Sequence, residues 1–232
     1  MTESEIDVLL WRPKDADDAA MRAGVLAEVE RLQAALPGHV CAFTPGCPAG
    51  SMPSLAHAEA GGPGLSRPDA LLHIRPFDAA AEQALAGLGD RLARSVERAE
   101  VFACIRHSVL PGYDTIRLFF GFQRLEHQTR EACHDYWLNV HADFGRRLIP
   151  PYSYHQLHVQ AEATARAAAA TGLPASVLDG VAEVYFPDIP AFIAQLSRPD
   201  VASEALEDER NFIDHARSLF WIYDMRAEQE PA

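Results

Sequence analysis

Two stretches of the sequence show the same order of features. Residues 70–88 read ALLHIRPFDAAAEQALAGL, and residues 180–196 read GVAEVYFPDIPAFIAQL. In each stretch a strand-like apolar run leads to an aromatic residue, an aspartate and a short amphipathic helix. The repetition indicates that the chain contains two copies of one structural unit.

The flanking segments extend this repeat to most of the chain. Runs of β-branched, aromatic and aliphatic residues predict strands at 6–13, 39–45, 69–77, 99–109, 115–125, 152–159, 179–188 and 217–225. Helical spacing of apolar residues predicts helices at 17–38, 78–89, 130–148, 161–171 and 189–197. Thr129 is placed to cap the third of these helices. Each copy therefore reads β-α-β, connector, β-α-β.

This order of elements is that of the ferredoxin-like unit. Such a unit forms a four-stranded antiparallel sheet with helices on one face, so the other face needs a cover. We therefore expect an α+β fold in which two ferredoxin-like repeats, residues 1–111 and 112–232, pack sheet to sheet as an intramolecular barrel. The alternative is two independent α+β domains with a linker near Pro111–Gly112.

The composition is that of a soluble globular protein, with 48% hydrophobic and 23% charged residues among 232. The net charge of −13 argues against nucleic acids and anionic membranes as partners. No signal peptide and no membrane-spanning run is recognisable, so we expect a cytoplasmic protein. The four cysteines form no CxxC pair, which favours reduced thiols. A disulfide bond between Cys41 and Cys47 remains an alternative.

Four of the ten histidines lie within residues 133–159. His134, Trp137 and His141 share one stripe of the predicted helix, because they are separated by three and four residues. In the strand that follows, side chains alternate between two faces. Leu157 and Val159 suit a helix-packed face. We therefore expect the face with Tyr154, Gln156 and His158 to line a cavity between the two sheets.

The same pattern argues against a bound cofactor. His134 and His141 are two turns apart, about 10 Å along the helix axis, which is too far to hold one ion easily. The sequence contains no HExxH, no glycine-rich nucleotide loop and no GxSxG. We expect neither a metal nor a cofactor. Each histidine could also be a structural core residue.

Imidazole and phenol groups without a cofactor suit proton transfer, because imidazole titrates near neutrality and a tyrosine can donate to an oxyanion. His141 or His134 is the expected general acid or base. Tyr154 and His158 are expected to orient the substrate or stabilise an oxyanion. The predicted substrate-binding residues are Trp137, Phe120, Phe122, Tyr185 and Arg130, with Arg147 as a further cation for a substrate carboxylate.

Residues 134–159, HDYWLNVHADFGRRLIPPYSYHQLHV, resemble the signature helix and strand of the EthD-like proteins, a family of the dimeric α/β-barrel superfamily. The resemblance covers about residues 114–226. His134 and His141 match the two histidines of the family's motif, and Trp137 matches its tryptophan. Members of the family form the barrel by dimerisation, so the resemblance implies that residues 5–109 supply the second half here.

That first half is degenerate, because its helix contains no histidine, tryptophan or tyrosine. The resemblance thus implies one pocket per chain, with His73, Arg75 or Arg106 lent to the opposite wall. Residues 45–68 are long enough to form a lid, or they form a surface insertion.

The superfamily's chemistry implies a cofactor-independent lyase, similar to a decarboxylase or cyclase, acting on a small apolar aromatic or polyketide-like substrate. The alternatives are a non-catalytic small-molecule-binding protein, and a haem-binding protein or cofactor-free monooxygenase. Either a monomer or a homodimer is compatible with the sequence.

Overall fold

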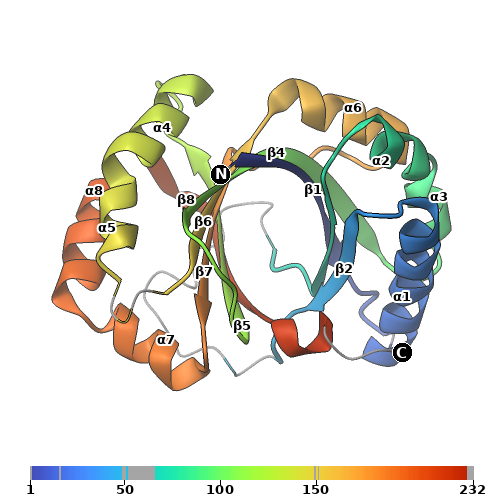
Figure 1. The fold of residues 1–232 in the computed structure, drawn as a ribbon, viewed down its shortest axis with the longest axis horizontal. Helices are drawn as coiled ribbons and strands as arrows, with labels where there is room; N and C mark the ends of the chain where they lie inside the picture. The colour runs from blue at the N-terminus through green and yellow to red at the C-terminus, as the bar shows by residue number, and fades with distance from the viewer. Residues whose placement is uncertain are drawn as a thin grey trace.

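Eight strands form one antiparallel sheet that curls into a barrel with helices outside it (Figure 1). The structure is a computed structural model that describes residues 2–15, 17–48, 51, 66–148, 150 and 152–228. Most of the predicted 45–68 lid lies outside the described residues, so the lid stays a prediction.

The first half has the ferredoxin-like order of elements. They are β1 (Thr2–Trp11), α1 (Asp18–Ala35), β2 (Val40–Pro45), β3 (Ala70–Arg75), α2 (Ala79–Ala84), α3 (Leu88–Leu92) and β4 (Arg98–Leu110). The strands lie side by side as β2-β3-β1-β4. The predicted helix at 78–89 is divided in two, because Gly87 takes a left-handed conformation with φ of 70°.

The second half repeats this arrangement. Its strands are β5 (Ile116–Arg124), β6 (Tyr154–Val159), β7 (Gly180–Phe186) and β8 (Ile213–Asp224), side by side as β6-β7-β5-β8. Its helices are α4 (Arg130–Tyr136), α5 (Ala142–Arg146), α6 (Ala161–Thr171), α7 (Ile189–Leu196) and α8 (Leu206–Glu209). Two π-helical turns, η1 (Trp137–His141) and η2 (Asp200–Ala205), and the 3₁₀ turn η3 (Met225–Glu228) complete it.

The two four-stranded units join along both edges. On one side β4 pairs with β6, for example through Cys104 and Val159. On the other side Gly46 bridges Tyr223, and the Cys47 N–H donates to the Ile222 carbonyl at 3.0 Å. The predicted fold class is therefore confirmed. The proposed boundary between residues 111 and 112 falls in the β4–β5 connector.

The repeated aspartate has the same structural task in both halves. Asp78 accepts a hydrogen bond from the Ala81 N–H at 2.9 Å, and Asp188 accepts one from the Ala191 N–H at 2.7 Å. Each aspartate thus caps the helix that follows its strand, which typically stabilises a helix by about 1 kcal/mol. Thr129 caps α4 in the same way, as predicted.

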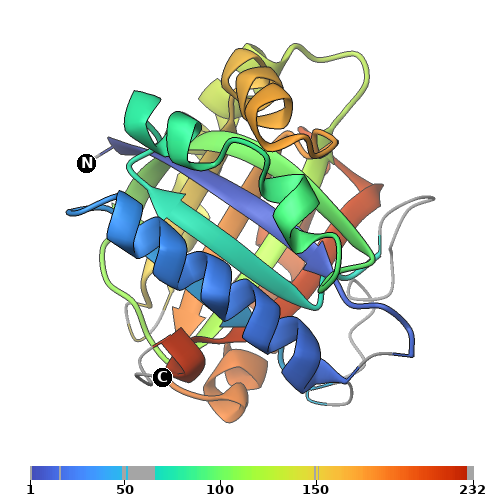
Figure 2. The same cartoon turned by 90° about the vertical axis from the view of Figure 1, so that its right-hand side faces the viewer.

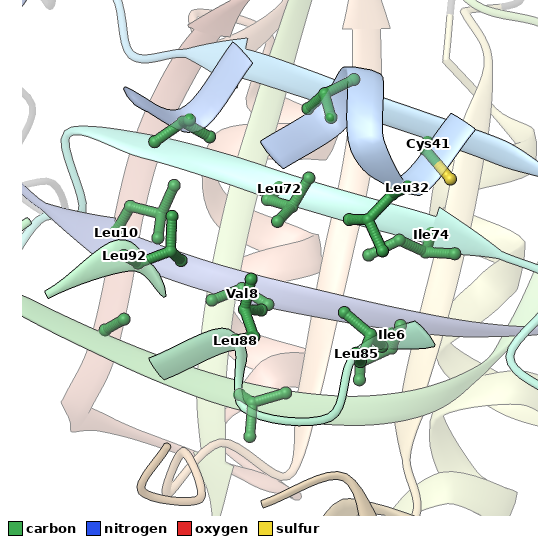
Figure 3. Packing of buried hydrophobic residues seen from close by; sticks show 14 of the residues in the cluster. Ile6, Val8, Leu10, Leu32, Cys41, Leu72, Ile74, Leu85, Leu88 and Leu92 are labelled. Carbon is green, nitrogen blue, oxygen red and sulfur yellow. The ribbon is translucent and has the colours of Figure 1, made fainter. Parts of the chain in front are cut away.

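The first half is packed as an ordinary hydrophobic core. Figure 3 shows Ile6, Val8 and Leu10 of β1 beneath the helices, next to Leu72 and Ile74 of β3. Helices α1, α2, α3 and α6 cover this outer face (Figure 2). The four cysteines are free thiols, and all are buried.

Candidate active site

A cavity of about 430 Å³ lies between the second half's sheet and its helices. Its walls are mainly apolar, which together with its volume is typical of small-molecule sites. The sheet contributes Leu118, Phe120, Val184, Phe186 and Phe220, and the helical side contributes Phe144, Leu148 and Leu206. Polar groups enter the wall at a few places, and each has a defined partner.

His141 is the first of these polar groups. Its Nδ1 lies 2.7 Å from Oδ2 of Asp208 on α8, and Oδ1 of that carboxylate accepts a hydrogen bond from the Tyr136 hydroxyl at 2.6 Å. A carboxylate can only accept, so Nδ1 carries the proton. The other ring nitrogen, Nε2, then keeps its lone pair. His141 is a cavity-lining residue whose second nitrogen has no hydrogen-bond partner among the described residues.

Tyr154 is the second. Its hydroxyl oxygen accepts hydrogen bonds from Trp137 Nε1 at 3.1 Å and from Gln156 Nε2 at 2.9 Å. Both lone pairs are occupied, and within the described part of the chain its own hydrogen finds no acceptor. Burial raises the pKa of Tyr154, so the phenol stays protonated. The arrangement leaves an O–H donor on a side chain that lines the cavity.

A second histidine–carboxylate pair lines the same cavity. His215 of β8 places Nε2 at 2.8 Å from Oε2 of Glu209, and its ring stacks against Phe120 with 6.4 Å between centroids. The paired carboxylates Asp208 and Glu209 are therefore neighbours on α8.

His134 and His158 lie outside the cavity lining. Their rings are 4.4 Å apart, and His158 stacks on Trp137 at 4.8 Å. His134 Nε2 bonds the Asp179 carbonyl at 2.8 Å, and His158 Nε2 bonds Gln156 at 3.0 Å. Burial, followed by the neighbouring His134 and His107, lowers the pKa of His158 to about 2. The two histidines thus pack behind the cavity wall, where His158 contacts Trp137 and Gln156.

The predicted orientation of β6 is wrong. Leu157 and Val159 point into the barrel, where they join the apolar cluster between the sheets. Tyr154, Gln156 and His158 face the α4–α5 helical segment, and the cavity lies on that side. The prediction failed because it treated the helix-packed face as apolar. Here the Trp137 indole and carbonyl satisfy the polar groups of the strand.

The other predicted residues divide between several places. Phe120 lines the cavity, while Phe122 is buried edge-to-face against Trp137, itself buried, at 4.8 Å. Arg130 pairs with Asp179 at 2.7 Å and does not line the cavity, nor does Arg147, which lies 3.4 Å from Glu204. Tyr185, His73, Arg75 and Arg106 line a different cavity inside the barrel, so the expected opposite wall is wrong.

Sequence reasoning missed Asp208, Glu209 and His215, which the structure adds to the site. The helical turns η2 and α8 were not predicted between the helix at 189–197 and the last strand. The acidic run that precedes His215 was a readable signal. The pairing of Asp208 with His141, 67 residues away, could not be predicted from the sequence.

The π-helical turn η1 lies in the middle of the motif helix, which consists of α4, η1 and α5, and changes its geometry locally. The Ala142 N–H donates to the Trp137 carbonyl five residues earlier, and that carbonyl also accepts from Gln156 Nε2 at 3.0 Å. Such turns insert one extra residue into a helix and occur frequently at functional sites. The turn spans Trp137 to His141, so it links the residue that holds Tyr154 to the imidazole of the cavity.

Gly145 allows the helix to approach Tyr154. A Cβ at residue 145 would lie 2.2 Å from Cδ1 of Tyr154. We expect Gly145→Ala to destabilise the protein by about 1–3 kcal/mol in urea unfolding, the usual cost of overpacking. Helix propensity alone favours alanine by roughly 1 kcal/mol, so a stabilised variant would contradict this contact.

Comparison with known proteins agrees with this architecture. The solved structures that resemble the chain include a chlorite dismutase variant from Candidatus Nitrospira defluvii (TM-score 0.54, 11% identity, covering 95% of this chain and 91% of that one). They also include a dye-decolorizing peroxidase from Bacteroides thetaiotaomicron (TM-score 0.53, 8% identity, 95% and 92% covered). At these identities the likeness shows the fold alone. The chain is thus a ferredoxin-like α/β-barrel protein.

The EthD domain family matches residues 125–216. Residues 125–216 therefore match the EthD domain that the sequence resembled, and the match includes the helical segment 130–146, β6, β7 and α8. No curated protein matches the chain. Across the described ranges no helix is both long and apolar enough to span a bilayer. In the same residues no group of three or more His, Cys, Asp or Glu side chains could hold a metal ion.

Proposed function

We propose that this protein is a small-molecule enzyme whose active site is the cavity lined by His141 and Tyr154. The reaction is a cofactor-independent lyase or cyclase step on a small, largely apolar, aromatic or polyketide-like substrate. The observation that carries the proposal is the His141–Asp208 pair at the wall of an apolar cavity that also holds a phenol donor. The EthD domain and the small-molecule enzymes that share the fold support it.

In this mechanism Nε2 of His141 exchanges a proton with a carbon or oxygen of the substrate. Asp208 fixes the tautomer and stabilises the imidazolium that forms, because its charge lies 2.7 Å from Nδ1. In decarboxylation Nε2 of His141 first takes the proton of the substrate's carboxylic acid. The bond between the carboxylate and the substrate carbon then breaks, CO₂ leaves, and the bonding electrons move to an enolate or phenolate oxygen that the Tyr154 O–H stabilises. The His141 imidazolium returns its proton to the carbon that lost CO₂.

The cavity also offers a place for the substrate's charge. Arg210 lines its wall and is exposed, with a bond to Glu207. A substrate carboxylate at this end would leave its apolar body among Phe120, Phe144 and Phe220. Arg210 thereby takes the role that was predicted for Arg130 and Arg147.

The proposal is tested with a panel of hydroxybenzoic acids and aryl β-keto acids, with CO₂ release as the readout. We expect turnover of a panel member by the wild type and its loss in His141→Ala. His127→Ala, which removes an exposed imidazole, is the matched control and should retain it. Turnover that survives in His141→Ala rejects the assignment. Binding without turnover would favour the alternative of a non-catalytic binding protein.

Haem binding is a second candidate, favoured by one specific feature. An imidazole whose Nδ1–H is held by a carboxylate, on an apolar cavity wall, is the arrangement common to metal-ligating and axial haem histidines. His141 would hold the iron, and haem would supply redox chemistry there. A Soret shift on adding hemin that is lost in His141→Ala and kept in His127→Ala would support this candidate. Unchanged hemin spectra would reject it.

The remaining expectations stand as part of this proposal. Tyr154 is assigned to substrate orientation and oxyanion stabilisation, and Phe120 to substrate binding. His134, His158, Trp137 and Phe122 are assigned to support of the wall. A cytoplasmic location and a monomeric or homodimeric state are retained.

A further inference from the structure

A second cavity, of about 410 Å³, lies inside the barrel on the opposite side of the sheet. Side chains alternate along β5 and β7, so each of these strands contributes residues to both cavities, one on either side of the sheet. Phe120 and Val184 line the outer cavity, whereas Arg117 and Tyr185 line the inner one. The inner cavity therefore takes residues from both halves of the chain, and nothing in the proposed function uses it.

Four arginines line this inner cavity, three of them from different strands and the fourth, Arg226, from η3. Arg106 of β4 binds Glu5 with two hydrogen bonds, at 2.6 and 3.0 Å, and pairs with Glu183 at 2.7 Å. Arg117 of β5 also pairs with Glu183. Arg75 of β3 has no ion pair within the described residues.

The carboxylates inside the barrel lie beside Arg106 and Arg117. Burial would raise the pKa values of Glu5 and Glu183, but Arg106 holds both below the ordinary value, so both are ionised. Burial, followed by the charge of Glu5, raises the pKa of Asp7 well above its ordinary value. Burial, followed by Arg117, lowers the pKa of His73 well below its ordinary value. Arg106 and Arg117 are thus both engaged by carboxylates, with Asp7 also 3.9 Å from Arg117.

Arg75 is the arginine of this cavity that is best placed to take a ligand. Its Nη1 donates to the Tyr113 hydroxyl at 2.5 Å, and its guanidinium lies 5.4 Å from the centroid of that ring. Its Nε is buried and has no hydrogen-bond partner among the described residues. Nearer the rim, Arg226 pairs with Asp224, and Asp114 is exposed to solvent.

We propose that the inner cavity binds a small planar monocarboxylate, whose carboxylate pairs with Arg75 and whose apolar body lies against Tyr113 and Tyr185. The guanidinium fork matches a carboxylate in two parallel hydrogen bonds. Tyr113 and Tyr185 form an edge-to-face pair at 5.2 Å, which provides an aromatic wall. Val40 and Met225 add apolar surface. One guanidinium without a carboxylate partner among the described residues matches one carboxylate, which favours a monoanion over a dianion.

Benzoate is the probe for this site, titrated calorimetrically into the folded full-length protein. Arg75→Gln is expected to weaken benzoate binding roughly 10- to 100-fold, the range for loss of a charge-assisted hydrogen-bonded pair. Arg75→Lys keeps the charge without the fork and should give an intermediate affinity. Arg94→Gln removes an exposed arginine that lines neither cavity, so it should bind benzoate as the wild type does.

Two further measurements fix the location and the ligand class. His141→Ala should retain the wild-type affinity for benzoate, because His141 lies on the other side of the sheet; a loss there would place benzoate in the outer cavity and overturn the proposal. Tyr113→Phe, at an exposed position, removes the hydroxyl that holds Arg75 and should weaken binding several-fold, which gives a second test if Arg75→Gln does not fold. The proposal is also overturned if the wild type does not bind benzoate, if neutral benzamide or inorganic phosphate binds as tightly, or if Arg75→Gln binds benzoate as the wild type does.

Discussion

Asp208→Asn is expected to lower the turnover number about 10²- to 10⁴-fold, the range that general acid–base catalysis typically contributes. The carboxylate lies 2.7 Å from His141 Nδ1 and fixes the proton on that nitrogen. An asparagine can instead present its amide N–H, which favours the tautomer with the proton on Nε2. The imidazole then has no lone pair for the substrate, even when the fold is intact.

The measurement is the pH–rate profile of the variant beside that of Glu207→Gln. Glu207 is exposed on the same helix, so its substitution removes the same charge without touching His141. We expect Glu207→Gln to keep both the turnover number and the profile. Asp208→Asn should change the acid limb as well as the maximum, whereas a merely structural role would lower stability and leave the profile in place. Equal rates for the two variants would refute the role of Asp208.

The protein is expected to lose stability as the pH falls below 6.5. The pKa values of five histidines are lowered, in each case first by burial: His73, His107, His134, His155 and His158. Below 6.5 the unfolded chain binds protons that the native state excludes, so the free energy of unfolding decreases with decreasing pH. For His158, whose native pKa is about 2, the loss is about 1.4 kcal/mol per pH unit.

Other groups set the limits of this pH window. The pKa values of Glu5 and Glu183 lie below 4.5, so their contribution is lost only under more acidic conditions. Burial raises the pKa values of Asp7 and Glu100, and their effect between pH 4.5 and 6.5 has the opposite sign. The net slope is therefore smaller than five histidines alone would give.

Substitution of His158 isolates the contribution of one histidine to the pH dependence of the free energy of unfolding. Urea unfolding at several pH values between 4.5 and 6.5 should give a slope for His158→Gln that is smaller than the wild-type slope by about one proton. Glutamine can keep a hydrogen bond to Gln156 but does not titrate. His127→Gln, at an exposed position, serves as the comparison. An unaltered slope in His158→Gln would mean that His158 is not held neutral in the native state.

The sequence by itself determined the eight strands, the main helices and their order. Capping aspartates at residues 78 and 188, apolar periodicity and the repeat depend on neighbours within a few residues. Local rules therefore predicted both ferredoxin-like units, and the curled eight-stranded sheet confirms them. The motif helix was predicted for the same reason, and the EthD domain match includes it.

Only the tertiary structure decided which face of β6 carries the site. Alternation divides Tyr154 and His158 from Leu157 and Val159, but both faces of a strand are buried in this barrel, so polarity does not identify the inner one. The partners of the site also come from far along the chain, as with His141 and Asp208, 67 residues apart. Such pairs form only when packing brings α8 beside the motif helix, and no local pattern encodes that distance.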